Sequence, residues 1–134
     1  MRFMAWHVDY FKAVPTERGR SKIAEDAEPI STGAALLVFE SFEKQDEQRA
    51  GIIEKSAAAI SEIARSVGAN TIILNPFAHM FGELSSPEFA QSATSSLASE
   101  LSKGFDVKRL AFGWFYEIEL KAKGHKLARQ SRIV

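Results

Sequence analysis

The sequence predicts an α/β fold, a single domain in which a mixed β-sheet packs with two main helices. Short apolar, β-branched or aromatic runs that suit strands alternate with two segments whose apolar residues recur every three or four positions, as in amphipathic helices. The chain has 134 residues, of which 46% are hydrophobic and 25% charged. This composition fits one folded domain and excludes a disordered tail protein.

The N-terminal third is expected to hold two strands. Phe3–Val8 is apolar and aromatic with no helix cap before it, which is typical of a buried first strand. Residues 12–33 are charged and small, with several Gly and Pro, and indicate a long surface connection or a mobile hairpin. Ala34–Phe42 is the second strand; it is apolar first and then alternating, so we expect one end to leave the core for a rim.

Two helices flank a third strand. Apolar residues spaced by three and four predict a helix between Gln48 and Val67, and Gly68 suits its C-terminal cap. Thr71–Leu74 is a β-branched run too short for a helix and is expected to be a central strand. A second helix is predicted from about Pro87, capped by one of two preceding serines, to the stop at Gly104.

The C-terminal part is predicted to be extended. Leu110–Lys121 alternates strictly between two faces, which indicates one long strand or two strands joined at a bend. Residues 123–125 suit a turn, and residues 131–134 begin another extended piece. Because that piece stops without a closing signal, we expect the chain to be part of a longer protein.

Charge and composition exclude several classes. The 17 basic and 17 acidic side chains cancel, so no global field attracts nucleic acid or lipid, and the absence of cysteine excludes disulfides and thiolate sites. No metal-binding spacing, signal peptide or membrane-length apolar run is present, and we expect a cytoplasmic protein. Residues 103–134 carry eight Lys or Arg and three acids. This basic segment is either a solvated edge or a surface that faces phosphates.

The segment Asn75–His79 follows the third strand and precedes the second helix, where α/β sheets commonly present ligands. His79 is either structural or a residue that binds or relays a proton. His125 is either a turn histidine on the surface or part of the basic segment, and His7 is most simply a buried, hydrogen-bonded residue. No nucleophile motif and no glycine-rich phosphate loop is present, so these residues alone leave the function open.

Several motifs together resemble one known family. They are the start Met1–Tyr10, Ser41–Lys44, Asn75–His79 with Glu83, Leu84 and Pro87, Ala111–Phe115, Lys123–His125 with Leu127 and Ala128, and Ser131–Arg132. In this order, along the whole chain, they are similar to the N-terminal editing domain of archaeal threonyl-tRNA synthetases. The resemblance implies a D-aminoacyl-tRNA deacylase-like fold, a homodimer, and residues 1–134 as an editing domain, the N-terminal part of a longer synthetase.

The resemblance also implies an activity: hydrolysis of L-serine from mischarged Ser-tRNA(Thr), assisted by the 2′-hydroxyl of the terminal adenosine. The implied partner is the acceptor end of tRNA(Thr), with a catalytic synthetase in cis or in trans, and no membrane. No metal or cofactor is implied for this domain. The site residues nominated by motif match are substrate-binding Ser41, Phe42, Glu43, Pro76, Phe77, Ala78, Ala90, Phe112 and Gly113, catalytic His79 and Tyr116, and tRNA-binding His125 and Arg129.

Two positions depart from the family pattern. Tyr116 stands where the family commonly has lysine, and Arg129 where it has glutamate. A tyrosine with an ordinary pKa of about 10 donates a hydrogen bond but is a poor base, whereas an arginine suits a tRNA phosphate. These departures keep open a non-catalytic module for acceptor-end binding or dimerisation. The fold similarity that the resemblance implies keeps open a D-aminoacyl-tRNA deacylase.

Overall fold

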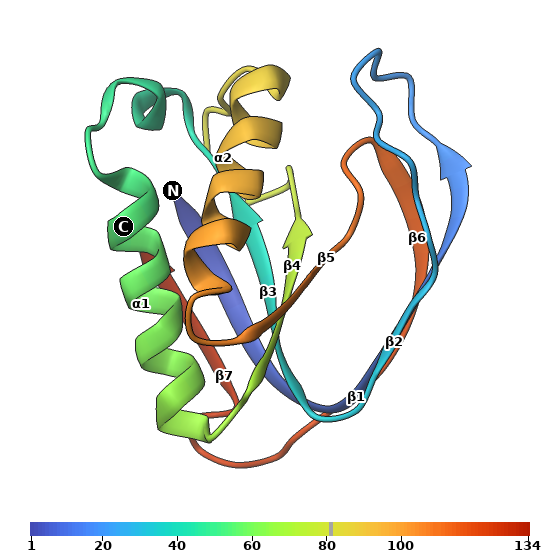
Figure 1. Cartoon of the computed structure of the whole chain (residues 1–134), viewed down its shortest axis with the longest axis vertical. Coiled ribbons are helices and arrows are strands. Elements are labelled where there is room, and N and C mark those ends of the chain that lie inside the picture. Colours follow the sequence, from blue (N-terminus) through green and yellow to red (C-terminus); the bar gives the residue numbers. More distant parts are fainter. Residues whose placement is uncertain (81) are drawn as a thin grey trace.

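The longest strand, β1 (Arg2–Arg18), organises the sheet, as the computed structural model of residues 1–80 and 82–134 shows (Figure 1). Its first half pairs with β3 (Ala35–Ser41) on one side and with β7 (Arg129–Ile133) on the other. Its second half pairs with β2 (Ile30–Thr32) and β6 (Trp114–Ala122). All four pairings are antiparallel, and β1 bends strongly between its two halves.

Two parallel strands and two helices complete the fold. β4 (Thr71–Pro76) pairs in parallel with β3, and β5 (Asp106–Arg109) pairs in parallel with β4. A short 3₁₀ helix, η1 (Lys44–Gln48), precedes α1 (Ile52–Val67), and α1 and α2 (Pro87–Leu101) lie side by side over one face of the sheet (Figure 1). The predicted fold class, an α/β domain with a mixed sheet and two main helices, is confirmed.

The core has two parts, because alternate residues of a strand point to opposite faces of the sheet. Leu36 and Val38 pack with the helices, together with Ile60 of α1 and Leu97 of α2. Leu37 faces the other way into a second cluster, which the bent β1 and the partly buried side chains of β6 cover. The sheet therefore folds over its own second face.

β1 is longer than predicted. The strand continues from Val8 through Arg18, so the first part of the segment that we expected to be a surface connection or a mobile hairpin is extended and paired. Its antiparallel pairing with β2 agrees with the hairpin alternative. Pro15 lies opposite Tyr116, and the register shifts between Pro15 and Glu17. Because proline cannot donate a hydrogen bond to a neighbouring strand, its presence suggested a loop. A bulge of this kind accommodates it within the strand.

Other boundaries differ for local reasons. The first helix begins at Ile52 and not at Gln48, and Gly68 ends it in the left-handed conformation (φ 70°) as predicted. Ser86 caps α2 by accepting a hydrogen bond from the backbone N–H of Phe89. Residues 110–113 form a turn between β5, which was not predicted, and β6, so the long strand expected from Leu110 begins only at Trp114.

Candidate active site

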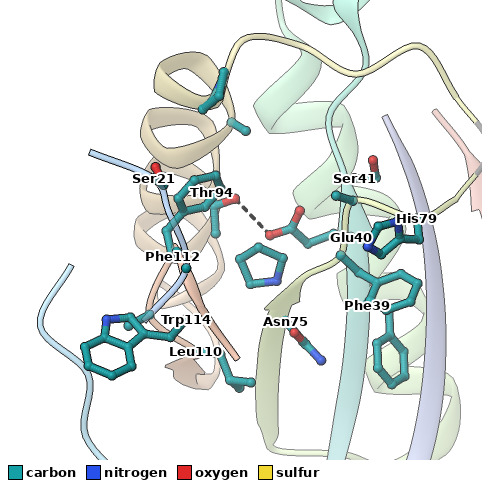
Figure 2. Close-up of a pocket in the computed structure, with 18 of the residues that line it drawn as sticks. Ser21, Phe39, Glu40, Ser41, Asn75, His79, Thr94, Leu110, Phe112 and Trp114 are labelled. Carbon is teal, nitrogen blue, oxygen red and sulfur yellow. Dashed lines mark hydrogen bonds between the residues drawn. The ribbon is translucent and has the colours of Figure 1, made fainter. Parts of the chain in front are cut away.

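A pocket of about 520 Å³ opens where the C-terminal ends of β3 and β4 meet α2 (Figure 2). Its remaining walls are residues 19–21, which follow β1, and the connection from β5 into β6. We call this cavity the strand-end pocket. It brings together ten of the residues nominated from the sequence: Ser41, Phe42, Pro76, Phe77, Ala78, His79, Ala90, Phe112, Gly113 and Tyr116.

The loop that leaves β4 forms one wall. Pro76 still pairs with Glu40 in the sheet, and the backbone N–H of Phe77 donates to the carbonyl of Glu40 at 2.8 Å. The ring of Phe77 stands edge-on to those of Phe39 and His79, with centroids 5.7 and 5.8 Å away. The side chain of His79 is exposed and lines the mouth of the pocket. A proline and edge-to-face aromatic contacts thus fix the wall beside an accessible imidazole.

The opposite wall depends on the close approach of two backbones. Gly113 has a positive φ of 83°, and its carbonyl accepts a hydrogen bond of 2.8 Å from the N–H of Gly19. A Cβ at Gly113 would lie 2.8 Å from the Cβ of Ala24. Glycine is therefore required there, both for the conformation and for the space.

Residues 19–25 form a strap that is tied to this wall. The carboxylate of Glu25 accepts hydrogen bonds from Arg109 Nη1 at 2.6 Å and from the backbone N–H of Phe112 at 2.8 Å, and its carbonyl accepts from Trp114 Nε1 at 2.7 Å. Burial opposes ionisation of Glu25, but the hydrogen bonds from Arg109 and Phe112 outweigh it and lower the pKa. Gln91 of α2 donates to the carbonyl of Ile23 at 2.9 Å. The strap is thus held at both walls of the pocket.

Glu40 and Thr94 lie on the inner surface of the pocket and were not predicted. Glu40 is 2% exposed and Thr94 1% exposed, and Thr94 Oγ1 donates to Glu40 Oε1 at 2.8 Å (Figure 2). Burial raises the pKa of Glu40 to about 8, against the lowering effects of Thr94 and Arg109. The available signal was a carboxylate inside an otherwise apolar strand, since such groups are rarely buried without a partner.

Tyr116 lines the pocket with its hydroxyl already engaged. The oxygen accepts a hydrogen bond of 2.9 Å from the backbone N–H of Ala111. Burial raises the pKa of Tyr116, and the negative charge of Glu25 adds to the rise. The phenol therefore stays protonated and stabilises the turn between β5 and β6, which makes it unsuited to removing a proton from water.

Three nominated residues lie outside the strand-end pocket. Glu43 is absent from the described lining of the pocket, and its carboxylate accepts hydrogen bonds from Arg2 Nε at 2.5 Å and from Gln45 Nε2 at 3.0 Å; its role in substrate binding stays a prediction. His125 Nε2 lies 2.9 Å from His7 Nδ1, and Arg129 is exposed on β7. The predicted contacts of His125 and Arg129 with tRNA therefore fall on another part of the surface and stay predictions.

The part of the chain that the structure describes offers no group of three or more His, Asp or Glu arranged to hold a metal ion. None of the helices in residues 1–80 and 82–134 combines the length and apolar character that a membrane crossing needs. Among the described residues that line the pocket, the titratable ones are Arg20, Glu40, His79 and Tyr116. The arrangement can bind a small, partly polar group between rigid walls and can orient it with backbone donors and acceptors.

Comparison with solved structures defines the class of fold. The c-Myc DNA Unwinding Element Binding Protein superposes on this chain with a TM-score of 0.71, covering 100% of this chain and 99% of that chain at 12% identity. The fold is D-aminoacyl-tRNA deacylase-like, as the resemblance implied. Identity this low carries the fold alone.

Sequence comparison defines the family. The model of the archaea-specific editing domain of threonyl-tRNA synthetase matches residues 1–134. The threonine–tRNA ligases of Methanococcus vannielii and Thermococcus sibiricus are 34% and 36% identical to the chain, which is covered in full and spans 22% of each relative. The chain belongs to this editing-domain family. An editing domain is the proofreading part of a synthetase, so the family places the chain in tRNA proofreading.

Proposed function

We propose that the strand-end pocket hydrolyses the ester that joins L-serine to tRNA(Thr) and leaves threonyl-tRNA(Thr) intact. The observation that carries the proposal is the pocket itself. In a chain of this family, it joins the Asn75–His79 loop and the Phe112–Gly113 turn, which lie far apart in the sequence, around one cavity.

The physical need for such a site is clear. Serine lacks only the methyl group of threonine, and one such group is worth about 1–3 kcal/mol of discrimination. A pocket that binds threonine therefore cannot exclude serine by affinity alone, and a second site must admit serine and repel threonine. Rigid walls make even one extra methyl costly to insert. Here Pro76 and the sterically crowded Gly113 provide such walls.

The chemistry we propose is assisted by the RNA. The 2′-hydroxyl of the terminal adenosine positions or activates the attacking water, while the protein orients the ester and donates hydrogen bonds to the oxyanion. His79 is exposed at the pocket mouth and is the nominated protein group beside the reaction. Tyr116, whose hydroxyl accepts from Ala111, contributes to the shape of the wall and not to proton removal.

The partners follow from this proposal. The domain receives the acceptor end of a mischarged tRNA(Thr), acts with a catalytic synthetase in cis or in trans, and works in the cytoplasm where tRNA is charged. A homodimer is also part of the proposal. Arg129, exposed on β7, and His125 are available for contacts with the RNA outside the pocket.

The direct test is deacylation of matched substrates. We expect the purified chain to release serine from Ser-tRNA(Thr) at least about tenfold faster than threonine from Thr-tRNA(Thr). Equal loss of both, or loss of neither, would count against the proposal. Faster cleavage of a D-aminoacyl-tRNA than of the L-seryl form would identify a stereochemical proofreader instead.

One observation favours a second candidate, a non-catalytic module that holds the acceptor end. Tyr116 replaces the lysine common in the family, and its hydroxyl is engaged with a raised pKa. Tight binding of a non-hydrolysable seryl-adenosine mimic, with no turnover of Ser-tRNA(Thr), would support this candidate against the hydrolase.

A further inference from the structure

We propose that Glu40 and Thr94 form a receptor for the side-chain hydroxyl of the bound aminoacyl group, so that the strand-end pocket demands a hydroxyl as well as refusing a methyl. This inference rests on the proposed function and identifies specificity-determining residues for it. The motif match nominated neither residue.

Glu40 and Thr94 come from two different elements and meet in the lining of the pocket. Thr94 lies one helical turn after Ala90 on α2, and both line the pocket together with Glu40 of β3. Both side chains are almost completely buried and still belong to the lining, so the pair forms part of the inner surface of the cavity (Figure 2).

The pair retains hydrogen-bonding capacity that its own contact does not use. Thr94 Oγ1 donates to Glu40 Oε1 at 2.8 Å, so Oγ1 keeps lone pairs that can accept. Among the described residues, Glu40 Oε2 has no hydrogen-bond partner, and Glu40 lines the pocket, so this oxygen is available to a ligand. The protonated acid, which burial favours, offers an O–H at this position.

A hydroxyl ligand satisfies both unused groups. It accepts from the O–H of Glu40 and donates to Thr94 Oγ1, whereas a methyl group leaves the acid without a partner. A buried polar group left unpaired is penalised more than a hydrogen bond contributes. The surrounding lining is mainly aromatic and aliphatic, with Phe39, Phe42 and Leu110 among its members. Glu40 is the only carboxylic acid in the described lining, and no other acid there can take this role.

The two filters together define serine. The crowded backbone walls reject the additional methyl of threonine, and the acid–hydroxyl pair rejects alanine and glycine, which lack the hydroxyl. Sites built to pair with a substrate hydroxyl discriminate strongly against the analogue that lacks it.

The experiment compares hydrolysis of tRNA(Thr) charged with serine and with alanine, after subtraction of the spontaneous rate. We expect the wild-type chain to prefer serine by about a hundredfold or more in kcat/KM. Glu40→Met removes the polar group at similar length and should lower this preference by roughly tenfold to a hundredfold. Thr94→Val should also lower it. Thr71→Val, at the opposite end of β4, is the matched control and should leave the preference unchanged.

The ratio separates recognition from a structural role. If Glu40 only supports the fold, Glu40→Met slows both substrates alike and keeps the preference, and that result would overturn the inference. Should this variant fail to fold, the wild-type chain still decides. Ionisation of Glu40 removes its O–H, so the serine preference should fall as the pH rises through about 8. Arg20, His79 and Tyr116, which also line the pocket, and Arg109 act on both substrates and cancel in the ratio. A preference that stays constant from about pH 6 to about pH 9 contradicts the inference.

Binding of non-hydrolysable seryl- and alanyl-adenosine mimics separates the two proposals. If the wild-type chain hydrolyses neither substrate but binds the seryl mimic more tightly, and Glu40→Met abolishes the difference, the hydrolase proposal fails and the receptor stands. If serine is released efficiently but alanine equally well, the receptor fails and hydrolysis stands.

Discussion

At the scale of single residues, Gly113 and Tyr116 explain how the Phe112–Gly113 turn is built. Gly113 provides a conformation and a clearance that an ordinary residue lacks, and the hydroxyl of Tyr116 accepts the N–H of Ala111. Both residues act on the shape of the strand-end pocket. Their substitution therefore tests shape separately from chemistry.

Gly113→Ala should destabilise the fold by about 1–3 kcal/mol, because the new methyl meets Ala24 and the φ of 83° disfavours any side chain. Urea unfolding of the variant measures this loss. Gly104→Ala is the matched control, since a Cβ there meets nothing within 4 Å. Equal stability of the two variants would show that the strap yields to the methyl at no cost.

Tyr116→Phe should reduce hydrolysis of Ser-tRNA(Thr) by less than about fivefold, whereas loss of a general base costs roughly 10²–10⁴. A tRNA that ends in 2′-deoxyadenosine should be almost inert, because the proposed mechanism needs that hydroxyl. Single-turnover rates on the two tRNAs measure both effects. A severe defect in Tyr116→Phe combined with normal cleavage of the deoxy substrate would contradict RNA assistance.

At the scale of elements, the strap of residues 19–25 connects segments that are distant in the sequence. It follows β1, yet its contacts reach Gly113 in the turn before β6 and Gln91 on α2. Glu25 is the main anchor, because its carboxylate pairs with both Arg109 and the N–H of Phe112. A change in this anchor should therefore reach the pocket without touching the substrate.

Glu25→Ala should lower kcat/KM for Ser-tRNA(Thr) by about tenfold and the free energy of unfolding by about 1–3 kcal/mol. The reason is that Arg109 and the backbone N–H of Phe112 both lose their hydrogen-bond acceptor. Deacylation rates and urea melts measure the two effects. Glu28→Ala removes an exposed carboxylate close by in the sequence and should change neither quantity. If Glu25→Ala matches this control in activity, the strap does not shape the site.

At the scale of the whole molecule, the mixed sheet sets where buried polarity is located. β3 has strands β1 and β4 on its two edges, and a hydrophobic cluster covers each of its faces. Glu40 near its end is therefore almost completely buried, yet it still lines the cavity. Global stability then depends on the protonation of this one acid.

Stability should fall as the pH rises from about 4.5 to about 8. The folded chain holds the Glu40 proton up to a pKa of about 8, whereas the unfolded chain releases it near 4.5, so the folded state binds more protons in this window. Relative to Glu40→Gln, the free energy of unfolding of the wild-type chain should fall by a few kcal/mol across this pH window and should change little above the window. Urea unfolding of both proteins at about pH 5 and about pH 9 provides the measurement. Parallel curves would mean that Glu40 ionises normally in the fold.

Much of this organisation was predictable from local patterns. The period of α1, the glycine that ends it, the serine cap of α2 and the β-branched β4 follow from interactions within a few residues. The resemblance to the family also nominated ten residues that line the pocket. The sequence did not predict the second half of β1, with Pro15 in a bulge, or the short strand β5. Both form because pairing with distant strands overrides local preference.

The sequence by itself determined the α/β class, the two helices and the family, since periodicity, caps and ordered motifs are properties of the chain. Only the tertiary structure decided that Glu43 faces Arg2, that Tyr116 is engaged by a backbone N–H, and that Glu40 meets Thr94 inside the pocket. The reason is physical. Hydrogen-bond partners and burial are set by segments between 5 and 54 residues apart in these three pairs, and they exist only once the strands and helices have packed.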